Sequence, residues 1–407
     1  MSRFSNHSEN NAASADMAPT PTPRARRMQL IQPFHVMEVL GRAFELESQG
    51  RSIVHMEVGE PDFVTPEPVV QAGIRALQAG RTHYTAATGL AELRAAIAQY
   101  YARRFSVDVD PRRILITPGS SAALQMITAL LVDPGSGLLL SDPGYPCNRN
   151  FVHLAGGVPQ PLPVTAATAY QPTLELTRRH WQPDTRALLV ATPANPTGTC
   201  IERSELAAIA DFVRARGGRL IVDEIYQGLT YEAPSYSALS LSSELFVINS
   251  FSKYFGMTGW RIGWLVAPEA YVGDLNKLAQ NLYIAAPTPA QYAALAAFDA
   301  ETIAILEQRR EAFQTRRDFL VPALRELGFG IAAQPQGAFY VYADCSRFTD
   351  DSFGFARALL EEAGVAVTPG LDFGAFGAAR HLRFAYTTTL ENLDAGVARI
   401  RSFLARE

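Results

Sequence analysis

The sequence predicts an α/β protein with two domains: a large domain built on a mostly parallel sheet flanked by helices, and a smaller α+β domain. Between residues 111 and 267, short apolar runs alternate with helical patterns, which is typical of a parallel sheet covered by helices on both faces. After residue 290, a long helical pattern is followed by separate strands and one more helix. This change of order indicates the second, smaller domain.

Chain length agrees with this division. A chain of 407 residues is longer than one hydrophobic core usually serves, and 48% of its residues are hydrophobic, which is ample for a buried core. Its first residues are rich in Ser, Asn, Ala, Pro and Thr, so we expect a disordered tail there. The predicted divisions are the tail over 1–27, an N-terminal arm with part of the small domain over 28–58, the large domain over 59–297, and the small C-terminal domain over 298–407.

Individual strands and helices are predicted from apolar runs that end in polar, Gly or Pro segments. The predicted strands of the large domain are residues 114–117, 137–141, 187–192, 220–223, 245–249 and 262–267. For the small domain we predict a long helix over 290–327 broken at Pro322, strands over 338–343 and 382–386, and a helix over 353–363. Because ligands of such sheets bind beyond the carboxyl ends of the strands, functional residues are expected at those ends.

Charge and cysteine content narrow the possible functions. A net charge of -4 argues against a nucleic-acid-binding surface, and no apolar run approaches the roughly 18–20 residues that cross a bilayer. Cys147, Cys200 and Cys345 stand far apart and the His residues are scattered, so neither a disulfide framework nor a metal site is predicted. We expect a cytoplasmic protein that acts on small molecules.

Lysine is scarce in this chain. Nearly all basic residues are Arg, and the only lysines are Lys253 and Lys277. Lys277 lies in a helical pattern, as a surface charge would, whereas Lys253 directly follows an apolar strand. An amine can form an imine and can lose its proton when its pKa is lowered, and a guanidinium does neither in practice. Lys253 is therefore the candidate for covalent chemistry.

Polar groups next to Lys253 suit a phosphorylated ligand. Ser250 and Ser252 offer hydroxyls, and Arg261 offers a planar fork that binds phosphate in a bidentate manner. An amine, hydroxyls and an Arg fork together suit a phosphorylated aldehyde.

The segment Ser250-x-Ser-Lys253, followed by Thr-Gly-Trp-Arg261-x-Gly, resembles the pyridoxal 5'-phosphate (PLP) attachment signature of fold-type I aminotransferases of class I/II. The resemblance extends from about Pro33 to the C-terminus. It implies an aspartate aminotransferase-like fold, with a large PLP-binding domain in which Lys253 holds the cofactor as a Schiff base. It also implies transfer of an amino group from an L-amino acid to a 2-oxo acid by a ping-pong mechanism, with Lys253 as the base.

Two segments beyond predicted strands match this family's cofactor site. Gly119, Ser120 and Ser121 open an apolar helix, whose free N–H groups and positive dipole end attract phosphate. The resemblance implies that these three residues bind the PLP phosphate. It also implies that Tyr145, which is flanked by turn residues, stacks on the pyridine ring.

An acid ends the apolar strand before Tyr226. A buried carboxylate such as that of Asp223 is costly without a positive partner, and the resemblance makes the pyridinium nitrogen of PLP that partner. It further implies that Asn195 and Tyr226 bond the phenolic oxygen of the cofactor, that Asn195 also contributes to substrate binding, and that the peptide before Pro196 is cis.

The ends of the chain supply the substrate contacts. The resemblance implies that Gly59 lets the backbone pass close to the substrate and that Arg383 binds the substrate α-carboxylate, with Arg380 as the alternative residue. Tyr84 matches a tyrosine that reaches the PLP phosphate of the neighbouring subunit. A homodimer with shared active sites is thereby implied.

The sequence leaves alternatives open. One is another PLP reaction on the same scaffold, catalysed by a β/γ-lyase or a synthase, and another is a non-catalytic PLP-binding effector protein. The substrate side chain is also open: Ser121 stands where some dicarboxylate-specific relatives carry Lys, but Arg149 or a residue of the partner subunit could supply a cation.

Overall fold

The computed structural model describes residues 24–232 and 235–406. The predicted disordered tail over 1–27 therefore lies almost entirely outside the described residues. The first described element is a short 3-10 helix, Arg26–Gln29.

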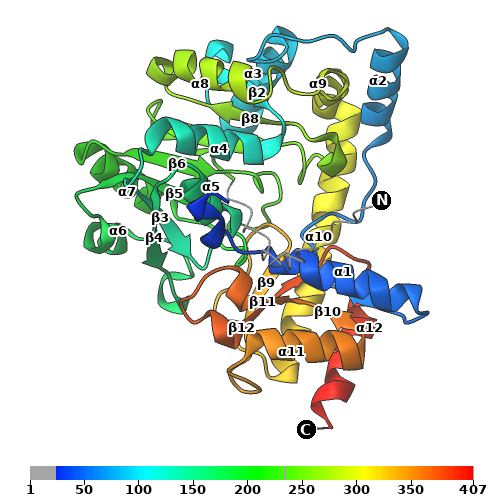
Figure 1. Ribbon diagram of the computed structural model, residues 1–407. Helices are drawn as coiled ribbons and strands as arrows, with labels where there is room; N and C mark the ends of the chain where they lie inside the picture. Colours follow the sequence, from blue (N-terminus) through cyan, green and yellow to red (C-terminus); the bar gives the residue numbers. More distant parts are fainter. Residues whose placement is uncertain (1–23, 233–234, 407) are drawn as a thin grey trace, which may run out of the picture.

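A seven-stranded mixed sheet forms the centre of the larger part of the described chain (Figure 1). In spatial order its strands are β2 (Ile114–Thr117), β8 (Gly263–Val266), β7 (Phe246–Ser250), β6 (Arg219–Asp223), β5 (Thr185–Ala191), β3 (Gly137–Asp142) and β4 (Val158–Pro163). Only β8 runs antiparallel to its neighbours, and the other pairs in this sheet are parallel. The predicted α/β class with a mostly parallel sheet is confirmed.

One strand of this sheet, β4, was not predicted. Its sequence, Val-Pro-Gln-Pro-Leu-Pro, carries three prolines, which lack the N–H that a central strand must donate. The strand lies at the edge of the sheet, where it pairs with β3 alone. An edge position tolerates proline, so the tertiary position of the segment outweighs its unfavourable sequence.

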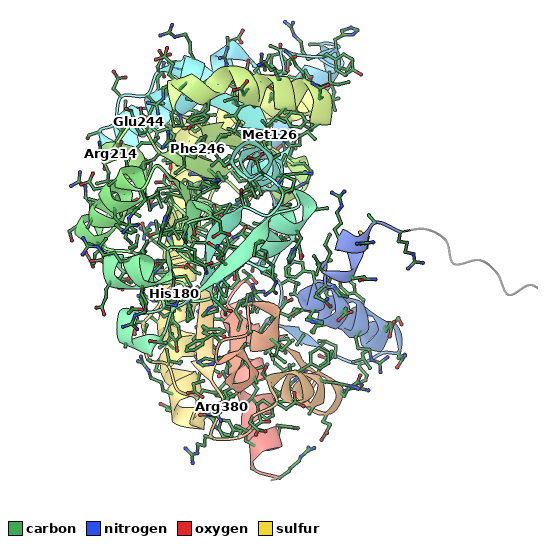
Figure 2. All side chains as sticks on the ribbon, turned by 60° about the vertical axis from the view of Figure 1, so that its left-hand side comes forward. Met126, His180, Arg214, Glu244, Phe246 and Arg380 are labelled. Carbon is green, nitrogen blue, oxygen red and sulfur yellow. The ribbon has the colours of Figure 1, made fainter. Side chains whose placement is uncertain are left out.

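Alternate residues of the strands enter two separate cores, one on each face of the sheet. On β2, Ile114 and Ile116 belong to the larger core, whereas Leu115 belongs to the smaller one. Met126 of α4 and Phe246 of β7, both labelled in Figure 2, pack in the smaller core. Helices cover both faces: α2 (Glu67–Gln78), α3 (Ala91–Phe105), α4 (Gly119–Leu131), α5 (Cys147–Leu154), α6 (Leu174–His180), α7 (Arg203–Ala215), α8 (Glu269–Leu282) and α9 (Thr288–Leu295).

The predicted long helix over 290–327 is two helices, α9 and α10 (Ala300–Leu327), separated by a 3-10 turn. The predicted break at Pro322 is wrong, because α10 continues through it and ends at Gly328, whose φ of 102° is left-handed. Leu320, Val321 and Leu324 around the proline are buried, so packing keeps the helix intact despite the lost hydrogen bond. Figure 1 shows α10 running from beside the large sheet down to the smaller sheets.

The smaller part of the chain contains two short sheets. One is three-stranded and antiparallel, in the order β11 (Thr368–Pro369), β12 (His381–Ala385) and β9 (Tyr340–Asp344), and the other pairs β1 (Val54–His55) with β10 (Val365–Ala366). The helices of this part are α1 (His35–Ser48), α11 (Ser352–Ala358), which continues into a π-helical turn, and α12 (Leu390–Leu404). The predicted strands and the predicted helix over 353–363 thus correspond to β9, β12 and α11 with its extension.

In the described part of the chain, no helix is long and apolar enough to span a membrane. No group of three or more His, Cys, Asp or Glu side chains within residues 24–232 and 235–406 could hold a metal ion.

Candidate active site

A cavity of about 250 Å³ lies where the strands of the large sheet end and the smaller part of the chain begins. Predicted site residues from widely separated segments of the sequence come together in this cavity. Eleven of the fourteen predicted site residues line the cavity: Gly59, Ser120, Ser121, Tyr145, Asn195, Asp223, Tyr226, Ser252, Lys253, Arg261 and Arg383.

Lys253 follows β7 by three residues and points into this cavity. Its Nζ donates a hydrogen bond to the carbonyl oxygen of Gly59 at 2.8 Å. Burial lowers the pKa of Lys253 to about 8; Glu60 and Asp223 raise it, whereas the positive charges of Arg383 and Arg261 lower it further. About a tenth of the amine is thus neutral at pH 7, far more than for an ordinary lysine, and the neutral form is the one that a nucleophile or base requires.

Lys277 provides the contrast. It lies on α8 with its side chain 75% exposed and pairs with Asp274 at 2.8 Å. That hydrogen bond raises the pKa of Lys277 above its ordinary value. Lys253 therefore lies in the cavity, whereas Lys277 lies in solvent.

Asp223 is the last residue of β6 and is 5% exposed. Its Oδ1 accepts a hydrogen bond from the N–H of Ile225 at 3.0 Å. Burial raises the pKa of Asp223 to about 6, while that hydrogen bond and the charge of Lys253 lower it. Because burial of an ionised carboxylate costs hydration energy, Asp223 would be stabilised by a cationic ligand group in the cavity and offers it a counter-charge.

One end of the cavity is a cradle for an anion. The start of α4 brings Ser120 and Ser121 to the wall, and a Cβ built on Gly119 would lie 2.6 Å from Nη2 of Arg261. Glycine suits that position because its φ of 75° is left-handed, and the guanidinium lies close to the helix start with its free N–H groups. Arg261 itself has a φ of 53°, a left-handed conformation that costs about 1–3 kcal/mol in a non-glycine residue and tends to occur at functional sites.

Three predicted residues lie outside the cavity lining. Gly119 is packed behind Arg261, and Ser250 donates its hydroxyl hydrogen to Oγ of Ser252 at 2.9 Å, so it stands one layer behind. Tyr84 lies in the loop after α2 and is 78% exposed, away from the cavity of its own chain.

Arg383 of β12 forms the opposite end. It is 2% exposed, its Nη1 donates to Oδ1 of Asn195 at 3.0 Å, and its Nη2 donates to Oγ1 of Thr368 at 3.2 Å and to the carbonyl of Glu57. In the described part of the chain these hydrogen-bond acceptors are all neutral groups, and Nε has no partner. A buried cation that is held only by neutral groups is placed to receive an anionic ligand. The alternative residue, Arg380, is exposed at the lower end of the molecule in Figure 2.

Aromatic side chains connect the two ends. Tyr226 and Tyr340 share a hydrogen bond of 2.9 Å between their hydroxyls, and burial raises the pKa of Tyr226 well above its ordinary value. The guanidinium of Arg383 lies 4.3 Å from the ring centroid of Tyr340. A Cβ on Gly59 would lie 1.8 Å from the hydroxyl of Tyr340, so only glycine fits at that position.

The peptide before Pro196 is cis, as the resemblance implied.

Comparison with known proteins identifies the family of this chain. A family model described as aminotransferase class I and II matches residues 51–400. The chain belongs to this family. This chain is 39% identical to valine–pyruvate aminotransferase from Mycobacterium tuberculosis, over 92% of this chain and 97% of that protein.

Solved structures agree. An aminotransferase from Mycobacterium tuberculosis matches with a TM-score of 0.92 and 38% identity, covering 95% of this chain and 100% of that one. Aspartate aminotransferase from Thermus thermophilus with maleate matches with a TM-score of 0.89 and 36% identity, over 94% of this chain and 99% of that one. The aspartate aminotransferase-like fold is confirmed.

The protein is thus a PLP-dependent transaminase whose substrates are amino acids and 2-oxo acids. The donor set of the cavity fits this cofactor. A lysine with a lowered pKa suits the aldehyde, Asp223 suits a protonated ring nitrogen, and Arg261 with the start of α4 suits the phosphate. These comparisons favour transamination over the lyase, synthase and non-catalytic alternatives.

Several lining residues of the aminotransferase were not predicted from the sequence. They are Phe34, Val36, Met37, Val58, Glu60, Leu124, Ala191, Ile225, Thr258 and Tyr340. Glu60 and Thr258 are neighbours of predicted residues, and closer reading of those segments could have found them. The residues at the start of α1 carry no local signal, because their position depends on contacts with the distant Asp372 and Tyr145.

Proposed function

We propose that Lys253 is the attachment point for PLP and the residue that carries the proton during transamination. The observation that supports this most is the position of its lowered-pKa amine, in one cavity with a buried acid and between an anion cradle and a buried arginine. When bound, PLP forms an imine with an amino group and withdraws the electron pair of the bond that breaks at the substrate Cα.

The remaining residues bind the cofactor in this proposal. Arg261 and the hydroxyls and amides of Gly119, Ser120, Ser121 and Ser252 hold the phosphate, with Ser250 orienting Ser252. Asp223 keeps the ring nitrogen protonated, and Tyr145 packs against the ring. Asn195 and Tyr226 donate hydrogen bonds to the phenolic oxygen, which Tyr226 can do because its raised pKa keeps the hydroxyl protonated.

Substrate is held between Arg383 and Lys253. The fork of Arg383 pairs with the α-carboxylate of an L-amino acid, and Asn195 adds a contact beside it. The carbonyl of Gly59 would orient the Lys253 amine, which, once the substrate amine has displaced it from the cofactor, would take the proton from the substrate Cα and deliver it to the carbon that carries the cofactor's aldehyde group. The same steps in reverse, with a 2-oxo acid, complete a ping-pong cycle.

We further propose a homodimer in which Tyr84 reaches the phosphate of the neighbouring subunit, since its ring is exposed and does not line the cavity of its own chain. We also propose that residues 28–58 and 298–407 form the small domain and that residues 59–297, which hold the large sheet and the cradle, form the large domain.

Three free cysteines spread over the chain favour a reducing, cytoplasmic location.

A matched pair of lysine variants tests the proposal. Lys253→Ala should abolish conversion of PLP to pyridoxamine phosphate by any amino acid, followed by absorbance, because no other amine lines the described cavity. Lys277→Ala should behave as the unmodified enzyme, since Lys277 is exposed on α8. Full activity of Lys253→Ala would contradict the assignment.

A further inference from the structure

One wall of the cavity has no role in the proposal above, and it is apolar. Its side chains are Phe34, Val36 and Met37, which are close together in sequence at the start of α1. Phe34 packs edge-on against the ring of Tyr145, with centroids 6.2 Å apart and planes at 86°. We call Phe34, Val36 and Met37 the apolar wall.

The apolar wall is fixed relative to Arg383. The carboxylate of Asp372 accepts hydrogen bonds from the backbone N–H of His35 at 3.0 Å and of Val36 at 3.3 Å. The next residue, Phe373, lies with its ring centroid 4.8 Å from the guanidinium of Arg383. A substrate whose α-carboxylate pairs with Arg383 therefore meets a wall in a defined position.

Among the described residues of its own chain, the cavity offers no spare cation for a second substrate carboxylate. Among the described residues, the basic side chains that line it are Lys253, Arg261 and Arg383, and each already has a role. Glu60 also lines the cavity and would repel another carboxylate. Arg149, the cation that the sequence left open, is not among the lining residues, and its Nη2 donates to the carbonyl of Asp372 at 2.6 Å.

We propose that this enzyme selects amino acids and 2-oxo acids with uncharged, apolar side chains, which lie against the apolar wall. The inference rests on the proposed role of Arg383, because that contact sets the direction of the side chain. A carboxylate against this wall would lose hydration without gaining a partner, whereas an apolar side chain gains by leaving water. Since both half-reactions use one cavity, the preference covers donor and acceptor alike.

The first test measures kcat/KM of the holoenzyme for the half-reaction with leucine, phenylalanine, alanine, aspartate and glutamate. Leucine and phenylalanine should exceed aspartate and glutamate by about 100-fold, because burying an unpaired charge is far costlier than burying an apolar group. Aspartate or glutamate as the best donor would overturn the inference and leave the proposed function standing. A lack of reaction with every donor would instead defeat the proposed function.

The second test compares two phenylalanine variants, one at the start of α1 and one within it. Phe34→Ala should lower kcat/KM for leucine and phenylalanine about tenfold and for alanine less than about threefold, since the alanine methyl group is too short to use the wall. Phe44→Ala, whose ring is 56% exposed and packs near His55, should leave every donor unchanged. An equal loss for all donors in Phe34→Ala would overturn the inference.

Binding of unreactive acids provides a readout without turnover. By calorimetry on the holoenzyme, 3-phenylpropanoate should bind at least about tenfold more tightly than succinate, and Phe34→Ala should reduce that ratio. Tighter binding of succinate would contradict the apolar wall as the specificity element.

Discussion

The two ends of the cavity are built in different ways. The anion cradle comes from the ends of neighbouring strands and the start of α4, so its residues belong to the large sheet. The substrate end is assembled from distant segments: Arg383 bonds Asn195 across 188 positions, and Asp372 bonds His35 across 337. In our proposal the first end binds the PLP that any transamination needs, and the second decides which substrate is used.

The largest effect is expected at the cofactor end. Asp223→Ala should still bind PLP, because Lys253 and the phosphate cradle remain, but turnover should fall on the order of 100-fold or more when the electrostatic partner of the ring nitrogen is lost. Steady-state kinetics with a saturated cofactor, checked by absorbance, measures this. An Asp223→Ala enzyme with normal turnover would refute the proposed role.

At the substrate end, Arg383→Lys keeps the charge but removes the fork. We expect the half-reaction with an amino acid to weaken by roughly 2–3 kcal/mol, or about 30–150-fold, while PLP stays bound. Single-turnover measurements separate this loss from cofactor binding. If PLP affinity fell as much as reactivity did, the division of the cavity into two functional ends would be wrong.

The pKa of Lys253 predicts a pH dependence at the cofactor end. Below a pKa of about 8 the amine is mostly protonated and cannot attack, so the rate of PLP attachment to the apoenzyme should rise with pH and level off above that value. Because the neutral fraction of such an amine rises from about a tenth at pH 7 to about nine tenths at pH 9, the rate should increase about tenfold over that range. A rate that keeps climbing beyond pH 10 would show an amine with an ordinary pKa.

The smallest effect is expected for Tyr84→Phe. The change removes one tyrosine hydroxyl that would hydrogen-bond the PLP phosphate. Because the cradle still holds that phosphate, PLP affinity should fall by only a few-fold, corresponding to about 0.5–1.5 kcal/mol.

Mixing Lys253→Ala subunits with Tyr84→Ala subunits should restore activity if the site is shared, because one site of each heterodimer is then intact. No recovery, with heterodimers confirmed by mass and a clear Tyr84→Ala defect, would place Tyr84 in its own subunit.

The same contrast explains what could be read from the sequence. The meeting of Lys253 and Asp223 in one cavity was predictable because Asp223 ends an apolar strand and Lys253 comes shortly after another, and strand ends meet at one edge of a parallel sheet. The roles of Phe34 and Tyr340 were not, since they arise from side-chain contacts with Tyr145 and Arg383 that no local pattern records. Likewise, β4 was missed and Pro322 misread because edge position and core packing outweigh the local preference of proline.

The most direct test of the account is chemical fixation of the cofactor. The holoenzyme should be yellow, and borohydride treatment followed by peptide mapping should place the reduced PLP label on Lys253, the lysine with the lowered pKa. Lys277 serves as the internal control, because it is the only other lysine in the sequence and is exposed. Label on Lys253 alone is the predicted result. Label on Lys277, or a protein that carries no label, would contradict the central assignment.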